Sequence, residues 1–97
     1  FVSKHPYLVW YILYKDGTLF GSVYIQFDNS IGIDLYEYNE KDFLIVIDYI
    51  KENHKPLDSI KSVRRNKFFI NVAKDNSNLI KILRNLNKAE IQRSFII

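Results

Sequence analysis

The dipeptide Asp16-Gly17 constrains this chain more than any other feature, because it interrupts an apolar and aromatic stretch that runs from Pro6 to Phe20. Asp-Gly between two apolar runs is the strongest short-range signal for a β-hairpin. The stretch also suits a helix, since Pro6 fits a first turn and Gly17 fits the position just past a helix end. Strand and helix lead to different folds, so this stretch decides what the protein is.

The next segment predicts a hairpin. Apolar and polar residues alternate from Thr18 to Phe27 and again from Ile31 to Tyr38, which is the period of a half-buried strand. Between the two runs, Asp28-Asn29-Ser30 has the composition of a turn. We therefore expect these runs to pair as antiparallel strands.

A helix is expected after this hairpin. Asn39 can cap a helix from about Glu40 to Asn53, and the acids of its first turn suit the positive end of the helix dipole. Apolar residues recur along it at helical spacing. Lys55-Pro56 then ends it, because the residue before a proline disfavours the helical conformation.

The C-terminal part of the chain predicts the same sequence of elements again. Leu57 to Val63 and Lys67 to Ala73 are expected to form two short strands around Arg64-Arg65-Asn66. A final helix is expected to follow, capped by Asp75 or Ser77. The order after the opening stretch is therefore strand, strand, helix, strand, strand, helix.

Length and composition bound the class of protein. The 97 residues, 47% hydrophobic and 15% aromatic, predict one folded α+β domain over residues 1–97. The apolar tail from Ile91 to Ile97 is expected to be a further strand or a docking segment. The chain has no cysteine, which excludes disulfides and thiolate metal sites. His5 and His54 lack zinc-site spacing, and His54 is expected to cap the end of the helix.

Charge and residue usage suggest partners and a setting. No apolar run is long enough to span a bilayer, so no membrane is expected as a partner. The net charge of +3 permits nucleic-acid binding without requiring it. Abundant Ile, Asn, Lys, Phe and Tyr are encoded by AT-rich codons, which suggests the AT-rich genome of an organelle, a phage or a low-GC microbe. The expected location is a mitochondrion or another AT-rich organelle, or otherwise the cytoplasm. The lack of methionine suggests that the chain is processed or is a portion of something longer.

With a helix at its start, the chain has the order αββαββα and resembles the LAGLIDADG homing-endonuclease and maturase family over nearly its whole length. The signature helix falls on Val9 to Gly17, and Thr18-Leu19 opens the first strand. Glu40-Lys41-Asp42 looks like the family's usual start of the second helix, and Asn66 to Val72 looks like a later strand. The resemblance implies an α+β LAGLIDADG-type domain with an antiparallel four-stranded saddle sheet.

The resemblance also implies a chemistry for the opening helix. In the family, paired helices each end in an acid that binds a divalent cation at the scissile phosphate, and Asp16 matches that acid as catalytic residue and Mg²⁺ ligand. Tyr11 stands where the family has a mid-helix glycine, and Lys15 stands where it has a small residue. These departures imply weak or lost cleavage.

The saddle sheet would place polar side chains in a DNA groove or against structured RNA. The residues expected to bind nucleic acid are Tyr24, Gln26, Lys61, Arg64, Arg65, Lys67 and Asn71. The resemblance thus implies a maturase, or an RNA-binding or structural component of a ribonucleoprotein such as a mitochondrial ribosome. The alternative is an active Mg²⁺-dependent endonuclease that cuts DNA as a homodimer.

If the opening stretch is a strand, the chain resembles a different family. Three meandering strands, a helix, more strand, and a helix after Asp75-Asn76 look like an N-acetyltransferase of the GNAT family. Such enzymes cradle a pyrophosphate with the backbone N–H groups of a glycine-rich loop at a helix N-terminus. The matching stretch, Tyr36 to Phe43, has no glycine and contains acids, which repel phosphate. A third class, a protein-interaction module, would use Trp10, Tyr11 and Tyr14.

Overall fold

The computed structural model describes residues 7–58, 66–91 and 94–97, which form an α+β arrangement of one six-stranded mixed sheet and two helices. The elements in chain order are β1 (Tyr7–Lys15), β2 (Thr18–Gln26), β3 (Ser30–Leu35), α1 (Glu40–Asn53), β4 (Phe69–Asn71), α2 (Ser77–Asn85), β5 (Glu90–Ile91) and β6 (Ser94–Ile96).

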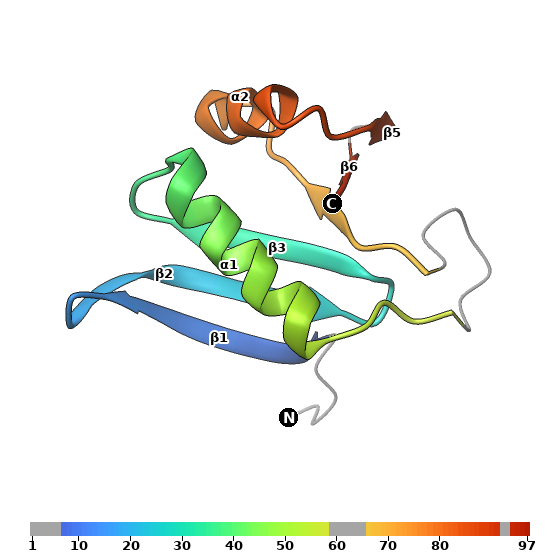
Figure 1. The fold of residues 1–97 in the computed structure, drawn as a ribbon, viewed down its shortest axis with the longest axis horizontal. Helices are drawn as coiled ribbons and strands as arrows, with labels where there is room; N and C mark the ends of the chain where they lie inside the picture. The colour runs from blue at the N-terminus through green and yellow to red at the C-terminus, as the bar shows by residue number, and fades with distance from the viewer. Residues whose placement is uncertain (1–6, 59–65, 92–93) are drawn as a thin grey trace.

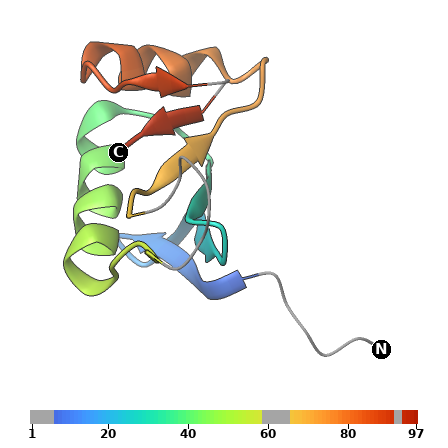
Figure 2. The ribbon, with the colours of Figure 1, turned by 90° about the vertical axis from the view of Figure 1, so that its right-hand side faces the viewer.

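The strands lie in the order β1-β2-β3-β4-β6-β5. All neighbouring strands are antiparallel except β3 and β4, which are parallel. Parallel neighbours need a crossover connection, and α1 provides it by crossing one face of β1, β2 and β3 (Figure 1). Figure 2 shows from the side that no element of the described residues covers the opposite face of these strands.

The opening stretch is a strand, so the expected first helix is wrong. Asp16 and Gly17 have φ angles of 52° and 79°, the two positive values that a two-residue type I′ hairpin turn requires. Lys15 and Thr18 pair across that turn. The order αββαββα and the four-stranded saddle sheet are therefore not the arrangement of this chain.

Side-chain packing explains why a strand forms here. Val9, Tyr11 and Leu13 pack against the core, while the residues between them face outward, which is the two-residue period of a strand. Apolar residues occupy both faces of β1, so this period is hidden in the sequence. Aromatic and β-branched residues such as Trp10 and Ile12 also favour strands over helices.

Some predictions for the remaining elements are confirmed and others are corrected. The β2–β3 hairpin and α1 are confirmed, and Asn39 caps α1 by accepting a hydrogen bond from the N–H of Asp42 at 2.9 Å. Asn76 caps α2, not Asp75 or Ser77. The strand expected from Leu57 to Val63 lies largely outside the described residues. The apolar tail contributes β6, which pairs with β4.

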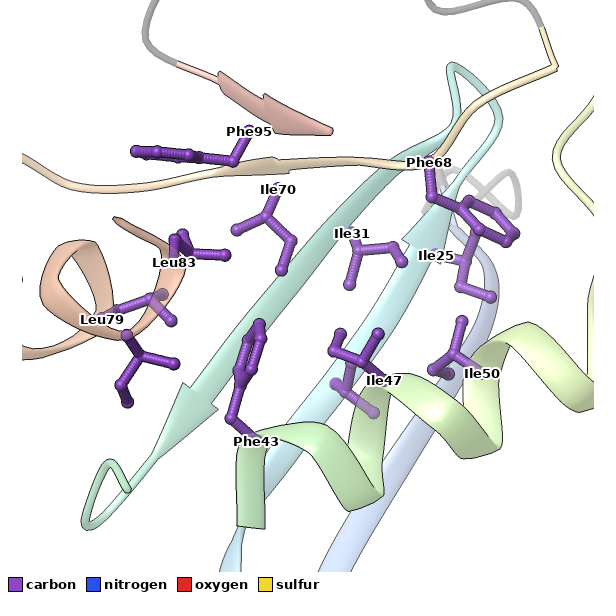
Figure 3. Close-up of a cluster of buried hydrophobic side chains, with 12 residues drawn as sticks. Ile25, Ile31, Phe43, Ile47, Ile50, Phe68, Ile70, Leu79, Leu83 and Phe95 are labelled. Carbon is purple, nitrogen blue, oxygen red and sulfur yellow. The ribbon is translucent and has the colours of Figure 1, made fainter. Parts of the chain in front are cut away.

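One hydrophobic core joins both helices to the sheet. Phe43 and Ile47 of α1 and Leu79 and Leu83 of α2 are all buried in one cluster. Figure 3 shows these side chains converging on the sheet. The strand residues of the cluster are Val23, Ile25, Ile31, Ile70 and Phe95. Both helices are thus held by the same core.

A buried asparagine closes one end of the structure. Asn29 lies in the β2–β3 turn with a positive φ of 66° and is fully buried. Its side chain donates to the carbonyl of Leu57 at 2.8 Å and accepts from the N–H of Leu57 at 2.7 Å. Its backbone carbonyl accepts from the N–H of Phe69 at 3.0 Å. Asn29 therefore ties the turn to the segment after α1 and to the start of β4.

We predict that Asn29→Ala lowers the free energy of unfolding by about 3 kcal/mol, because two buried hydrogen bonds are lost and a positive φ is left to alanine. Asn87→Ala is the matched control, since Asn87 has a φ of 57° but an exposed side chain. It should cost about 1 kcal/mol. Urea denaturation measures both, and equal losses would contradict the role of the Asn29 side chain.

Candidate functional site

The parallel strands β3 and β4 separate toward their carboxyl ends. They pair only at Ser30 with Phe69 and at Ile31 with Ile70, although β3 continues to Leu35. We call the space between the diverging strands the fork. In open α/β sheets, ligands bind beyond the carboxyl ends of parallel strands, so the fork is a candidate position for a binding site.

The side chain of Tyr38 occupies part of the fork. Its hydroxyl donates to the carbonyl of Ile33 at 3.2 Å and accepts from the N–H of Leu35 at 3.1 Å. Both backbone groups lie on β3 beyond its last pair with β4. A ligand strand or amide that sought these two groups would have to displace Tyr38.

The fork opens into a polar groove of about 620 Å³. Three carboxylates line it, from Asp34, Glu37 and Asp75, and no lysine or arginine of the described residues does so. The residues that line the groove are Asp34, Leu35, Tyr36, Glu37, Tyr38, Ala73, Asp75, Asn76 and Asn78. Its charge therefore disfavours anions.

The start of α1 does not fit a pyrophosphate. Helix N-termini attract phosphate through free N–H groups, but the side chain of Asn39 already occupies the N–H of Asp42. Glu40 and Asp42 add carboxylates to the same turn. The element order agrees with the acetyltransferase interpretation, whereas the residues at this position do not fit the group that such an enzyme would hold.

Lys15 has a partner that the sequence did not reveal. Its Nζ lies 2.8 Å from Oδ2 of Asp42, joining the end of β1 to the first turn of α1. The hydrogen bond to Asp42 raises the pKa of Lys15. The same bond, with a second from Asn39, lowers the pKa of Asp42. Lys15 thus holds the hairpin against the helix.

The opposite end of α1 is basic. A cavity of about 220 Å³ is lined by Lys51, His54, Lys55 and Lys67, and no carboxylate side chain lines it within the part of the chain that the structure describes. Pro56, Asn66, Phe68 and Ile97 complete its lining. We call this cavity the basic end. It brings together side chains from the last turn of α1, the segment after it and the approach to β4.

Tyr11 orients one member of the basic end. Its hydroxyl lies 2.7 Å from Nε2 of His54, and its ring meets the ring of Tyr49 edge-on at 5.5 Å. Burial raises the pKa of Tyr11, and Tyr49 adds to the effect. His54 occupies the C-cap position of α1, where its backbone N–H donates to the carbonyl of Ile50. The sequence indicated that cap but not the contact with Tyr11.

The predicted site residues do not come together. Asp16 lies exposed in the β1–β2 turn and not at the end of a helix. Tyr24 is on the outer face of β2, where its ring packs against Trp10 at 5.7 Å. Gln26 ends the same strand. Asn71 is part of a hydrogen-bonded link, accepting from Ser94 and donating to Ser30.

The basic residues of the prediction divide into two groups. Lys67 lines the basic end, so the structure places one of them in a charged cavity. Lys61, Arg64 and Arg65 lie outside the described residues. Sequence analysis missed Lys51 and Lys55, although their pattern of a last-turn lysine followed by His54-Lys55 was a signal for a cationic helix end.

Over residues 7–58, 66–91 and 94–97, no three His, Asp or Glu side chains gather in a way that would hold a metal ion. None of the helices described is long and apolar enough to cross a membrane. Comparison with protein-family models, with curated proteins and with solved structures finds no match.

We predict that the Lys15–Asp42 pair stabilises the fold in a pH-dependent way. Asp42 has a lowered pKa, so its contribution is present above its ordinary value of 3.8 and is lost as the pH falls through the folded-state value. Lys15→Met should therefore lower the urea midpoint at neutral pH and have no effect at about pH 2. Lys81→Met, at an exposed position of α2, is the control. An equal loss from Lys15→Met at both pH values would contradict the pairing.

Proposed function

We propose that this chain is a nucleic-acid-binding domain that holds phosphates at its basic end. The single observation that supports the proposal is the cavity lined by Lys51, His54, Lys55 and Lys67. Lysine ammonium groups neutralise backbone phosphates without regard to base sequence. The proposal rests on this charge and not on the resemblance to the LAGLIDADG family, whose opening helix is absent.

The charge at the basic end favours anions, although a helix C-terminus carries a partial negative charge. The C-terminus of α1 contributes roughly half a negative charge. Three lysines at the same place outweigh it. The N–H of Asn66 donates to the carbonyl of Leu57 at 3.0 Å, which joins the approach to β4 to the segment that follows α1. Lys61, Arg64 and Arg65 remain predicted nucleic-acid-binding residues and lie outside the described residues.

The groove near the start of α1 and the cavity at its end differ in charge, which would orient a polyanion. Carboxylates line the groove and lysines line the cavity, although α1 itself also carries Lys41 in its first turn and Glu52 in its last. A helix of 14 residues spans roughly 21 Å. A strand of nucleic acid would therefore be attracted to one end and repelled from the other.

Residue usage and charge also suggest a biological setting for the chain. An RNA-binding component of a ribonucleoprotein, in a mitochondrion or another organelle with an AT-rich genome, agrees with the codon bias and the mild positive charge. Cleavage is not part of the proposal, because the exposed turn at Asp16 lacks the paired helices that would bring two acids to one phosphate.

We predict that single-stranded RNA binds with an affinity that falls steeply with salt concentration. Replacing Lys51, Lys55 and Lys67 together by Gln should reduce the slope of log affinity against log salt by about 2, since each lost phosphate contact removes about 0.7. Fluorescence anisotropy with labelled RNA and with duplex DNA measures the slope and compares the two nucleic acids.

The matched control replaces Lys74, Lys81 and Lys88 by Gln, which removes the same charge elsewhere. This variant should keep most of the salt slope. Equal losses in the two triple variants would show that net charge alone is responsible. Unchanged binding in the Lys51, Lys55 and Lys67 variant would refute the proposed site.

Acetyl-coenzyme A provides a second test, because the order of strands and helices favours an acetyltransferase-like framework. A shared framework does not carry an activity with it, and the acids beside the fork should repel the pyrophosphate. We predict no saturable binding by calorimetry at millimolar ligand, and a gain of binding in the Glu37→Gln, Glu40→Gln double variant. Saturable binding to the unchanged protein would overturn the assignment.

A further inference from the structure

The β1 strand forms one edge of the six-stranded sheet that the described residues build, and the middle of this strand lacks the features that usually block pairing at an edge. No charged residue occurs from Tyr7 to Tyr14, and proline is also absent from the strand. Natural edge strands are normally blunted by lysine, proline or bulges. Register irregularities occur only near the two ends of β1, so Val9 to Leu13 is a regular stretch.

Apolar side chains are exposed on both sides of this edge. On the outer face, Trp10 is 54% exposed and Ile12 is 56% exposed. On the helix side, an apolar groove of about 590 Å³ runs between β1 and α1, and Ile45 and Tyr49 on its helix wall are 59% and 50% exposed. Apolar side chains therefore remain exposed on both faces of the sheet at its β1 edge.

These features define what would complete the sheet. The occupant must be an extended strand, uncharged, with apolar side chains on both faces, because charged groups would be buried against Trp10 on one side or Tyr49 on the other. β1 itself meets this description and is the outermost strand of the sheet that the described residues form. We propose that two copies of this chain associate through antiparallel pairing of their β1 strands.

A two-fold axis at Tyr11 gives the most complete pairing. Tyr11 is the midpoint of the regular stretch, so Val9 of one copy would face Leu13 of the other. Trp10 would face Ile12 of the second copy on the outer face. The two grooves would meet on the helix side, where Ile45 and Tyr49 of both copies lie. Such an interface uses the same patch on each subunit, as closed dimers do.

The expected size of the interface places it among weak dimers. The exposed apolar side chains beside the edge are Leu8, Trp10, Ile12, Tyr14, Ile45 and Tyr49. If each buries on the order of 100 Å², the two copies together bury on the order of 1,200 Å². That is the lower limit of stable interfaces, so dimerisation in the micromolar range is expected.

Sedimentation equilibrium over a range of concentrations tests the proposal, with Trp10 as the reporter because it is the one tryptophan of the chain. The dimer should shift Trp10 emission to shorter wavelength as concentration rises. Ile12→Lys and Ile45→Lys should each leave a monomer with an unchanged circular dichroism spectrum. Phe27→Lys, at a position 52% exposed in the β2–β3 turn, should still dimerise.

Three results would overturn the proposal. A chain that stays monomeric at high micromolar concentration has no such interface. A dimer that survives both Ile12→Lys and Ile45→Lys uses another surface. A dimer lost equally in the Phe27→Lys variant reflects general loss of apolar surface and not pairing at β1. RNA binding at the basic end is measured separately, so either proposal can fail alone.

Discussion

The arrangement of this chain depends on the buried hydrogen bonds of Asn29. Its side-chain amide donates to the carbonyl of Leu57 and accepts from the N–H of Leu57, as a neighbouring strand would. Its backbone carbonyl accepts a hydrogen bond from the N–H of Phe69. A buried amide with unsatisfied bonds would be costly, so these partners specify where the chain returns after α1. By holding Phe69 beside the β2–β3 turn, Asn29 places the start of β4 beside the start of β3, where the two strands pair in parallel.

The two ends of α1 lie in different chemical environments. The diverging strands leave an acidic groove at the start of the helix, where Tyr38 caps two backbone groups of β3. The closed end brings lysines of α1 and of the approach to β4 into one cavity. The framework alone would suggest a ligand in the fork, but the charges there favour the opposite end for any polyanion.

Local signals predicted the elements whose information is local. The alternation of β2 and β3, the turn at Asp28-Asn29-Ser30 and the cap at Asn39 all produce the expected structures. The opening stretch misled because apolar residues on both faces of β1 conceal its two-residue period, and because Asp16-Gly17 suits both a turn and a helix end. Tyr11 and Lys15, which fitted the helical interpretation poorly, instead contact His54 and Asp42.

Long-range contacts account for what the sequence could not predict. The parallel pairing of β3 with β4 joins residues some forty positions apart, and no periodicity encodes it. Lys67 was predicted as a cationic site residue, yet its neighbours Lys51 and Lys55 meet it only through the fold. Tyr24 and Asn71 were predicted as exposed recognition residues. Asn71 is exposed and also contacts Ser94, whereas Tyr24 is half-buried and packs against Trp10.

The fold depends on whether Val9 to Lys15 is a strand, and nuclear Overhauser effects between backbone protons distinguish a strand from a helix there. A β1–β2 hairpin predicts cross-strand contacts between Tyr11 and Val23 and between Leu13 and Gly21, which are partners in the observed register. A helix would instead give contacts between residues three positions apart, such as Trp10 with Leu13. Cross-strand effects without those helical contacts are the result that the structure predicts. Helical contacts along Val9 to Lys15 would contradict it.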